Sequence, residues 1–213
     1  MKKILLFTLL FILAFVGVYY AASLNTNFNA TRSCKKFAIR ISDKDELNKL
    51  NSFAAQAKIF AAENSYNTGF CFLLDMSLPG GQNRFFVYDL DRDSILNAGL
   101  VAHGSCNTRF LEKAAFSNQP GCGCSAKGKY KVGYRYNGRF GIAYKLYGLD
   151  KSNSNAFDRN IVLHSYYLVP EKEVKPFPIC NSLGCAMVSD GFIKQLALKI
   201  DASQQPILLW IFE

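Results

Sequence analysis

Short hydrophobic runs separated by turn residues occupy the chain from residue 69 onward. Three of these runs, at residues 69–78, 83–92 and 94–105, are rich in aromatic and aliphatic side chains and are separated by Pro-Gly-Gly-Gln and Asp-Arg-Asp. Short runs of this composition, bounded by turn residues, are typical of β-strands. The pattern predicts a domain that is mostly β.

The next segment adds the clearest hairpin signal in the chain. Residues 128–149, GKYKVGYRYNGRFGIAYKLYGL, alternate aromatic and polar side chains on both sides of Asn137-Gly138, a dipeptide that favours the tight turn of a β-hairpin. Residues 159–169 and 206–212 are further strand candidates. Late in the chain only residues 190–200 have a helical pattern, so we expect few short helices.

A helix is predicted before the β-rich part. Ser42 and Asp45 have the spacing of a capping box, and apolar residues then recur on one helical face. These residues are Leu47, Leu50, Phe53, Ala57 and Phe60. We expect a helix from about residue 43 to 63 whose apolar face packs on the core, within a linker and helical extension over residues 23–68. Residues 69–213 would form the main domain.

The first 22 residues have the pattern of an export signal. Two lysines precede an apolar run over residues 4–22 that contains no charge, and Ala21 and Ala22 are small enough for a cleavage site. At about 1.5 Å per residue the run also reaches roughly 28 Å, enough to cross a bilayer. We expect a signal peptide or an N-terminal membrane anchor, and a domain that works in the periplasm or cell envelope.

The charge balance is basic. The chain has 25 Lys and Arg against 16 Asp and Glu, a formal +9; without residues 1–22 the counts are 23 and 16, a formal +7. This charge suits an anionic polymer of the envelope, although it also serves solubility alone. Because the cations are scattered and the longest basic run is Lys35-Lys36, we expect no binding to nucleic acid.

His164 and Cys185 have the layout of a catalytic pair. His164 ends an apolar run that predicts a strand, and Cys185 follows Ser182 and Gly184 in a short turn. A neighbouring imidazole activates a thiol, whose ordinary pKa is about 8.5, and can return the proton to a leaving amine. The Gly184 and Cys185 amides could hold a developing oxyanion, with the Ser182 hydroxyl as a further donor.

The cysteine count keeps other interpretations open. Seven cysteines in an exported chain usually form disulfides, and His164 could be a packed core histidine. Seven is odd, however, so one thiol stays free or pairs between molecules, and Cys185 is the best candidate for it. A disulfide between Cys106 and either Cys122 or Cys124 is favoured, while the pairing of Cys34, Cys71 and Cys180 is left open.

A metal site is not expected. Cys122 and Cys124 could in principle form a metal site with His103, Cys106 and His164. A single residue separates the two cysteines, however, whereas structural zinc sites favour a spacing of two to four residues.

The segments around His164 and Cys185 also resemble a known family. IVLHSYYL, followed after His164 by 17 residues and then SLGC, resembles the signature of the bacterial murein L,D-transpeptidase catalytic domain. The segments VAHGS at 101–105, FSNQPGCGCSAKGKY at 116–130 and NSLGCAMV at 181–188 occur in the order expected of this family. The resemblance covers roughly residues 69–213.

The resemblance implies a β-sandwich-like domain that acts on the peptide stems of peptidoglycan without a metal or other cofactor. Cys185 would form an acyl-enzyme with the third stem residue, and His164 would act as acid and base. Attack by an amine of a second stem would give a 3–3 cross-link. Attack by water would make the same site an L,D-carboxypeptidase.

Two departures from the family pattern concern substrate binding. The commoner motif has His in place of Leu183 and an Asn or Arg shortly after the cysteine, where this chain has Ala-Met-Val. Arg159 and His103 are the candidates to bind the substrate carboxylate instead, although a surface arginine and a packed histidine would look the same in sequence. A further departure lies in GCGCS at 121–125, where the murein L,D-transpeptidase-like subgroup of the family tends to have serines in place of the cysteines.

Two other functions compete with this one. A papain-like or amidase-type cysteine peptidase usually places its cysteine before its histidine, the reverse of the order in this chain. A non-catalytic cell-wall-binding domain could keep the fold, but it would not need to retain His164, Ser182, Gly184 and Cys185 together. The sequence does not predict an oligomeric state.

Overall fold

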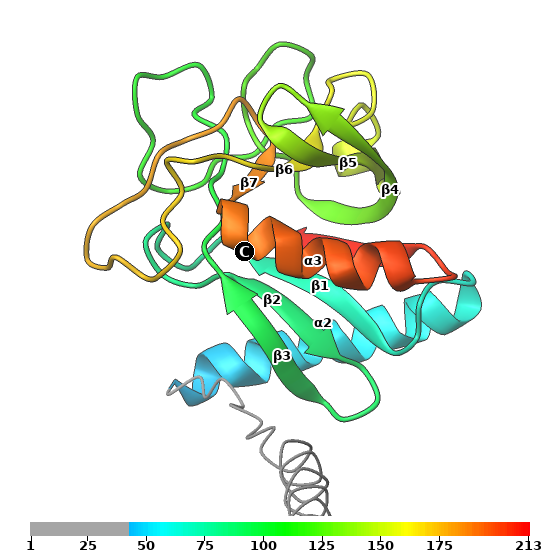
Figure 1. The fold of residues 1–213 in the computed structure, drawn as a ribbon. Coiled ribbons are helices and arrows are strands. Elements are labelled where there is room, and N and C mark those ends of the chain that lie inside the picture. Colours follow the sequence, from blue (N-terminus) through cyan, green and yellow to red (C-terminus); the bar gives the residue numbers. More distant parts are fainter. Residues whose placement is uncertain (1–42) are drawn as a thin grey trace, which may run out of the picture. The chain divides into compact units, whose positions relative to one another are not determined.

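The computed structural model describes residues 43–213, which form eight β-strands and two α-helices (Figure 1). The helices are α2 (Lys44–Glu63) and α3 (Asp190–Ala202), and a short 3-10 helix, η1, spans Lys151–Asn153. The strands are β1 (Phe70–Asp75), β2 (Phe85–Asp89), β3 (Ser94–Gly99), β4 (Gly128–Gly138), β5 (Gly141–Gly148), β6 (Val162–Ser165), β7 (Ala186–Val188) and β8 (Ile207–Phe212). The predicted mostly β domain with few helices is confirmed; the three-residue β7 was not predicted.

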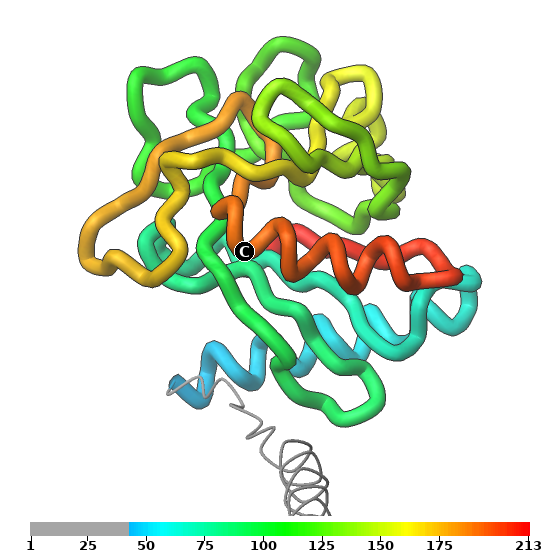
Figure 2. The backbone as a smooth tube through the Cα atoms, in the orientation of Figure 1, coloured from blue at the N-terminus to red at the C-terminus, as the bar shows by residue number. Residues whose placement is uncertain are grey.

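All eight strands belong to one sheet in the order β3-β2-β1-β8-β4-β5-β6-β7. The pairs β1–β8 and β6–β7 are parallel and the other pairs are antiparallel. β8 therefore lies in the middle of the sheet and joins β1–β3 to β4–β7. The smooth tube in Figure 2 shows these two halves below and above α3.

The main core lies between the two halves of the sheet and around α3. Phe192, Ile193 and Leu196 of α3 pack there against Phe72 and Phe85 of β1 and β2, and buried residues of β4–β7 complete the cluster. Apolar residues at positions three and four apart give α3 the buried stripe that this location requires. The bent sheet encloses this core on two sides, as expected for a sandwich-like domain.

Helix α2 packs on the opposite face of β1–β3, as the ribbon in Figure 1 shows. Its buried residues Leu50, Ala54, Ala57 and Ala61 belong to a second hydrophobic cluster with β1, β2 and β8. The predicted helix and its packing on the core are confirmed. Asp43 is the N-cap, one residue later than the predicted Ser42, and its carboxylate accepts a hydrogen bond from the Asp45 amide at 2.9 Å.

The hairpin of β4 and β5 is present, but its turn lies two residues beyond Asn137-Gly138. Gly138 pairs with Gly141, which leaves Arg139 and Phe140 as the turn residues. Packing decides the register: with this turn the Phe140 ring stacks on His164, 5.6 Å between centroids. A turn at Asn137-Gly138 would satisfy local preference but would move Phe140 away from that contact.

The predictions for residues 1–22 and for most of the linker lie outside the described residues. Within residues 43–213, no helix has the length and apolar character needed to cross a membrane.

Candidate active site

The pairing of β6 with β7 brings His164 and Cys185 together. The two strands are parallel, with His164 opposite Met187. Cys185 lies two residues before Met187, and alternate residues of a strand project to the same side of a sheet. The imidazole and the thiol are therefore on one face, and both line the same two cavities.

His164 is fixed in an orientation that suits a general base. The side chain is 8% exposed, and Nδ1 lies 2.8 Å from the backbone carbonyl oxygen of Ser165. Because a carbonyl only accepts, Nδ1 carries the proton and Nε2 keeps its lone pair. Phe140 stacks over the ring. Burial lowers the pKa of His164 below its usual 6.5, so the imidazole is neutral at neutral pH.

The Cys185 thiol is half-buried and free. Its Sγ lies 3.6 Å from the carbonyl oxygen of Asn160, to which the thiol donates. Burial raises the pKa of Cys185 above its usual value, opposed by the Val162 backbone and by the positive charges of Lys145 and Arg159. The resting pair is thus a neutral thiol beside a neutral imidazole.

Ser182 and Gly184 shape the turn that presents Cys185. The Ser182 hydroxyl donates to the Cys185 carbonyl at 2.7 Å and accepts from the Gly184 amide at 3.0 Å. Gly184 has φ +114°, and a Cβ there would lie 2.7 Å from the carbonyl oxygen of Cys124, so only glycine fits. This corrects one expectation: in this structure the Gly184 amide and the Ser182 hydroxyl bind one another and brace the turn rather than face an oxyanion.

Two cavities meet at the His164–Cys185 pair. The larger has a volume of about 630 Å³ and its lining includes Phe110, Phe140, Tyr166 and the 75% exposed Leu183. The smaller has about 220 Å³ and lies under the β4–β5 turn. Each cavity has a single charged lining residue, an arginine.

These two residues, Arg109 in the larger cavity and Arg139 in the smaller one, were not identified from the sequence. Both lie in irregular segments, where no hydrophobic period or motif spacing marks a residue that faces a site.

Arg159 is directed away from the larger cavity. Its guanidinium donates to the Ser117 carbonyl at 2.7 Å, to Cys122 Sγ at 3.2 Å and to the Cys124 carbonyl. These bonds hold the loop that precedes β4 against the Gly184 turn. The predicted role of Arg159 in binding a substrate carboxylate is therefore not supported by its contacts.

His103 also lies outside both cavities. Its side chain is 3% exposed, its Nδ1 accepts from Arg84 Nη2 at 2.8 Å, and its Nε2 donates to the Leu111 carbonyl at 3.0 Å. Burial and the charge of Arg84 lower the pKa of His103 to about 4. His103 is a packed histidine, the alternative stated above, and the expectation that it binds substrate is corrected.

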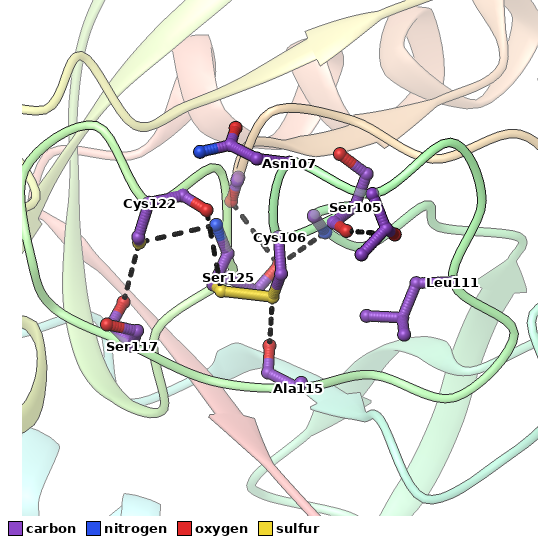
Figure 3. The surroundings of a disulfide bond; sticks show 12 residues. Ser105, Cys106, Asn107, Leu111, Ala115, Ser117, Cys122 and Ser125 are labelled. Atoms are coloured by element: carbon purple, nitrogen blue, oxygen red, sulfur yellow. Dashed lines mark hydrogen bonds between the residues drawn. A yellow bond between two sulfur atoms is a disulfide. The ribbon is translucent and has the colours of Figure 1, made fainter.

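A disulfide joins the two loops behind the Cys185 turn (Figure 3). Cys106 pairs with Cys124, one of the two predicted partners. Cys122 keeps a free thiol, whose sulfur accepts a hydrogen bond from the Cys124 amide at 3.4 Å. Ser125, next to the disulfide, donates to the Gly184 carbonyl at 3.4 Å and accepts from the Gly104 amide. The disulfide therefore supports the Cys185 turn through the neighbouring Ser125. Within residues 43–213 no cluster of His, Cys, Asp and Glu side chains could hold a metal ion.

Comparison with solved structures gives several distant matches. An L,D-transpeptidase from Xylanimonas cellulosilytica is 11% identical, with a TM-score of 0.40, over 72% of this chain and 68% of that chain. The helical cell shape determining protein Pgp2 from Campylobacter jejuni is 12% identical, with a TM-score of 0.40, over 76% of this chain and 55% of that chain. The match therefore spans about half the length of Pgp2.

A third structure, a fused Zn-dependent amidase/peptidase/peptidoglycan-binding domain-containing protein from Clostridium acetobutylicum, is 15% identical, with a TM-score of 0.37, over 88% of this chain and 74% of that chain. No curated protein sequence matches the chain. A comparison with family models, by contrast, matches residues 43–210 to the L,D-transpeptidase catalytic domain. Because this match covers most of the chain, including β6, the Cys185 turn and β7, the chain belongs to the L,D-transpeptidase catalytic domain family.

Proposed function

We propose that this protein is a cysteine L,D-transpeptidase that joins peptide stems of peptidoglycan, with Cys185 as nucleophile and His164 as general base and acid. The observation that carries the proposal is the arrangement of the pair: the thiol and the imidazole lie on one face where two cavities meet. The bond from His164 Nδ1 to the Ser165 carbonyl leaves Nε2 free to take a proton.

In the first half of the reaction, Cys185 Sγ attacks a stem carbonyl carbon and its proton passes to His164 Nε2. The carbon–nitrogen bond then breaks, the imidazolium gives the proton to the leaving amine, and a thioester remains. In the second half an amine of another stem attacks the thioester and gives up a proton to His164. The new amide leaves, the proton returns to sulfur, and the enzyme is regenerated.

The protonation states support this route. Because burial raises the pKa of Cys185 and lowers that of His164, thiolate and imidazolium are both disfavoured before substrate binds. Proton transfer would then accompany attack on the carbonyl. A neutral His164 is the form that can accept the proton, so activity is expected to persist below pH 6.5 and to fall only at the lower pKa of this histidine.

The larger cavity suits the stem that is attacked. Arg109 is its single charged lining residue, and a guanidinium binds a carboxylate well. The apolar wall of Phe110, Phe140 and Tyr166 would hold the peptide. The smaller cavity, which Cys185 also lines, offers a second path by which the amine of another stem could reach the thioester. The signal expected over residues 1–22 would bring the domain to its substrate in the envelope.

Muropeptides with tetrapeptide stems test the proposal. The protein is incubated with them and the products are identified by mass spectrometry, beside Cys185→Ala and Cys122→Ser variants. Cys122 is a matched control because it is a free thiol that lines neither cavity. We expect 3–3 linked dimers with the wild type and Cys122→Ser, and none with Cys185→Ala.

Other products would change the assignment. Tripeptides without dimers would indicate an L,D-carboxypeptidase that uses the same site. Unchanged substrate with every protein, while the domain remains folded by circular dichroism, would refute the enzymatic proposal and leave a wall-binding domain.

A further inference from the structure

We propose that Lys145 is a positioning residue for the nucleophile: its ammonium group fixes Asn160, whose carbonyl holds the Cys185 thiol, and it stabilises the thiolate that forms during attack. This inference deepens the proposed function, since it assumes that Cys185 is the nucleophile. Its test, however, reads the thiol directly and needs no peptidoglycan substrate.

The sheet register places Lys145 on the same face as the thiol. In the β5–β6 pair Lys145 lies opposite Val162 and Ala143 lies opposite His164. In the parallel β6–β7 pair Val162 is the neighbour of Cys185, the residue just before β7. Residues directly opposite one another in a sheet project to the same side. Lys145, Val162 and Cys185 therefore form one row across three adjacent chain segments.

Two contacts fix the position of the ammonium group. Lys145 Nζ donates to Asn160 Oδ1 at 2.8 Å and lies 4.9 Å from the centre of the Phe157 ring. Cation–π contact and a charged hydrogen bond both hold the ammonium in place. Within residues 43–213, the hydrogen bond that restrains the Asn160 side chain comes from Lys145.

Asn160 transmits this restraint to sulfur. Its backbone is in the left-handed region, φ +55°, and its amide donates to the Phe157 carbonyl at 3.0 Å. Its own carbonyl oxygen accepts from the Cys185 thiol at 3.6 Å. A left-handed asparagine is held partly by the contacts of its side chain, so losing the Lys145 bond would loosen the carbonyl that orients the thiol.

The charges around Cys185 identify Lys145 as the cation that a substitution can remove cleanly. Positive charge reaches the sulfur from Lys145 on β5 and from Arg159 in the loop before β6. The other titratable groups near it are His164 on β6 and Tyr130 and Tyr136 of β4, which are neutral at neutral pH. Arg109 and Arg139 add positive charge, because each lines one of the two cavities that Cys185 also lines. Arg159 also holds the loop next to the disulfide, so its removal would disturb the turn as well.

The test is the pH dependence of Cys185 alkylation by iodoacetamide, followed by mass spectrometry of the peptide that contains Cys185. In Lys145→Met we expect the alkylation midpoint to rise by about half to one pH unit, and the rate at pH 7 to fall about threefold to tenfold, because the thiolate loses a nearby cation. Lys145→Arg keeps the charge and should stay within about twofold of the wild type.

The matched control is Lys131→Met. Lys131 also lies on the β4–β5 hairpin with its ammonium over an aromatic ring, 4.7 Å from the centre of Tyr147, but it has no bond to Asn160. We expect its alkylation profile to match the wild type. An unchanged profile in Lys145→Met, or an equal shift in Lys131→Met, would overturn the inference. If instead the shift occurs but muropeptides are not processed, the proposed function fails and the role of Lys145 stands.

Discussion

The two histidines of this chain are both buried and neutral, yet their surroundings give them different roles. His103 uses both ring nitrogens: Arg84 donates to one, and the other donates to the Leu111 carbonyl. His164 uses only Nδ1, and within residues 43–213 its Nε2 has no hydrogen-bond partner. His103 thus fixes Leu111, two residues after the cavity-lining Arg109, whereas His164 itself lines the larger cavity.

The difference shows that burial and a lowered pKa do not by themselves mark a catalytic histidine. Burial lowers both pKa values, but a base also needs a free lone pair that points at a nucleophile. His164 has a free Nε2 and lines both cavities together with Cys185, whereas both ring nitrogens of His103 are engaged. Substituting each histidine should therefore damage a different property of the protein.

The largest effect is expected for His164→Gln. Removing a general acid and base lowers kcat/KM by about 10² to 10⁴, while glutamine can still donate to the Ser165 carbonyl and keep the local fold. Initial rates with a tetrapeptide-stem muropeptide and a thermal melt of the same sample would measure both properties. A variant that retains more than about a tenth of wild-type activity would argue against His164 as the base.

His103→Ala should instead reduce stability. The substitution takes away a hydrogen-bond acceptor from Arg84, whose side chain is 1% exposed, and leaves the Leu111 carbonyl with one partner fewer. Arg84 keeps its bonds to the Val101 and Leu78 carbonyls, and the Leu111 carbonyl keeps Asn181. The loss of two buried hydrogen bonds should therefore cost about 1 to 3 kcal/mol of the free energy of unfolding. Urea unfolding at pH 7.5 measures it. If His103→Ala unfolds like the wild type but loses all activity, the division of roles between the two histidines is wrong.

The pH dependence of stability should also separate the two histidines. The pKa of His103 is about 4 in the folded protein against about 6.5 in an unfolded chain. As the pH falls, the unfolded state binds the proton first. The lowered pKa of His103 therefore leaves the free energy of unfolding unchanged above pH 6.5. Between pH 6.5 and pH 4 it lowers that free energy by about 2 to 3 kcal/mol.

Comparison with a variant isolates that contribution. His103→Gln should lose less stability than the wild type between pH 7.5 and pH 4.5, while carboxylates contribute equally to both proteins. The gain in stability at low pH relative to the wild type should be smaller for His164→Gln. Burial lowers the pKa of His164, but without the repulsion that Arg84 adds at His103. Equal losses in the wild type and His103→Gln would contradict the assignment of a depressed pKa to His103.

The smallest effect is expected at Arg109, on the loop that His103 anchors. Arg109→Ala removes an exposed cation from the larger cavity and should raise KM about tenfold for a stem with a free carboxylate, with little change in kcat. A stem whose carboxylate is amidated provides the control. The wild type should bind this amide as weakly as the variant binds the acid. If amidation of the stem weakens its binding to Arg109→Ala as much as it weakens its binding to the wild type, the arginine does not contact the carboxylate.

Local sequence signals were sufficient to predict most strands and both helices. They also singled out His164 and Cys185, which line the same two cavities. His164 follows an apolar run, and Cys185 follows a Ser-x-Gly turn, so each is marked by its own neighbours in the chain. The disulfide between Cys106 and Cys124 was also among the predicted pairings. The strands and helices depend on residues that are close in sequence, where periodicity and turn preference are informative.

The features that were missed depend on distant contacts. Arg159 and His103 were predicted to bind substrate, but their partners, such as the Cys124 carbonyl and Arg84, are residues that no local pattern connects with them. Strand β7 has three residues, too few for alternation to be visible, and it exists because β6 pairs with it. The hairpin turn moved because Phe140 packs on His164.

The central position of β8 also limits the order in which the protein can fold. β8 follows every other strand in sequence, yet it pairs with β1 on one side and with β4 on the other. During synthesis, β1–β3 with α2 and the later β4–β7 unit emerge first, and the sheet cannot become continuous until residues 207–212 leave the ribosome. The sheet that carries the Cys185 turn is therefore completed last through its middle, when β8 is added between β1 and β4.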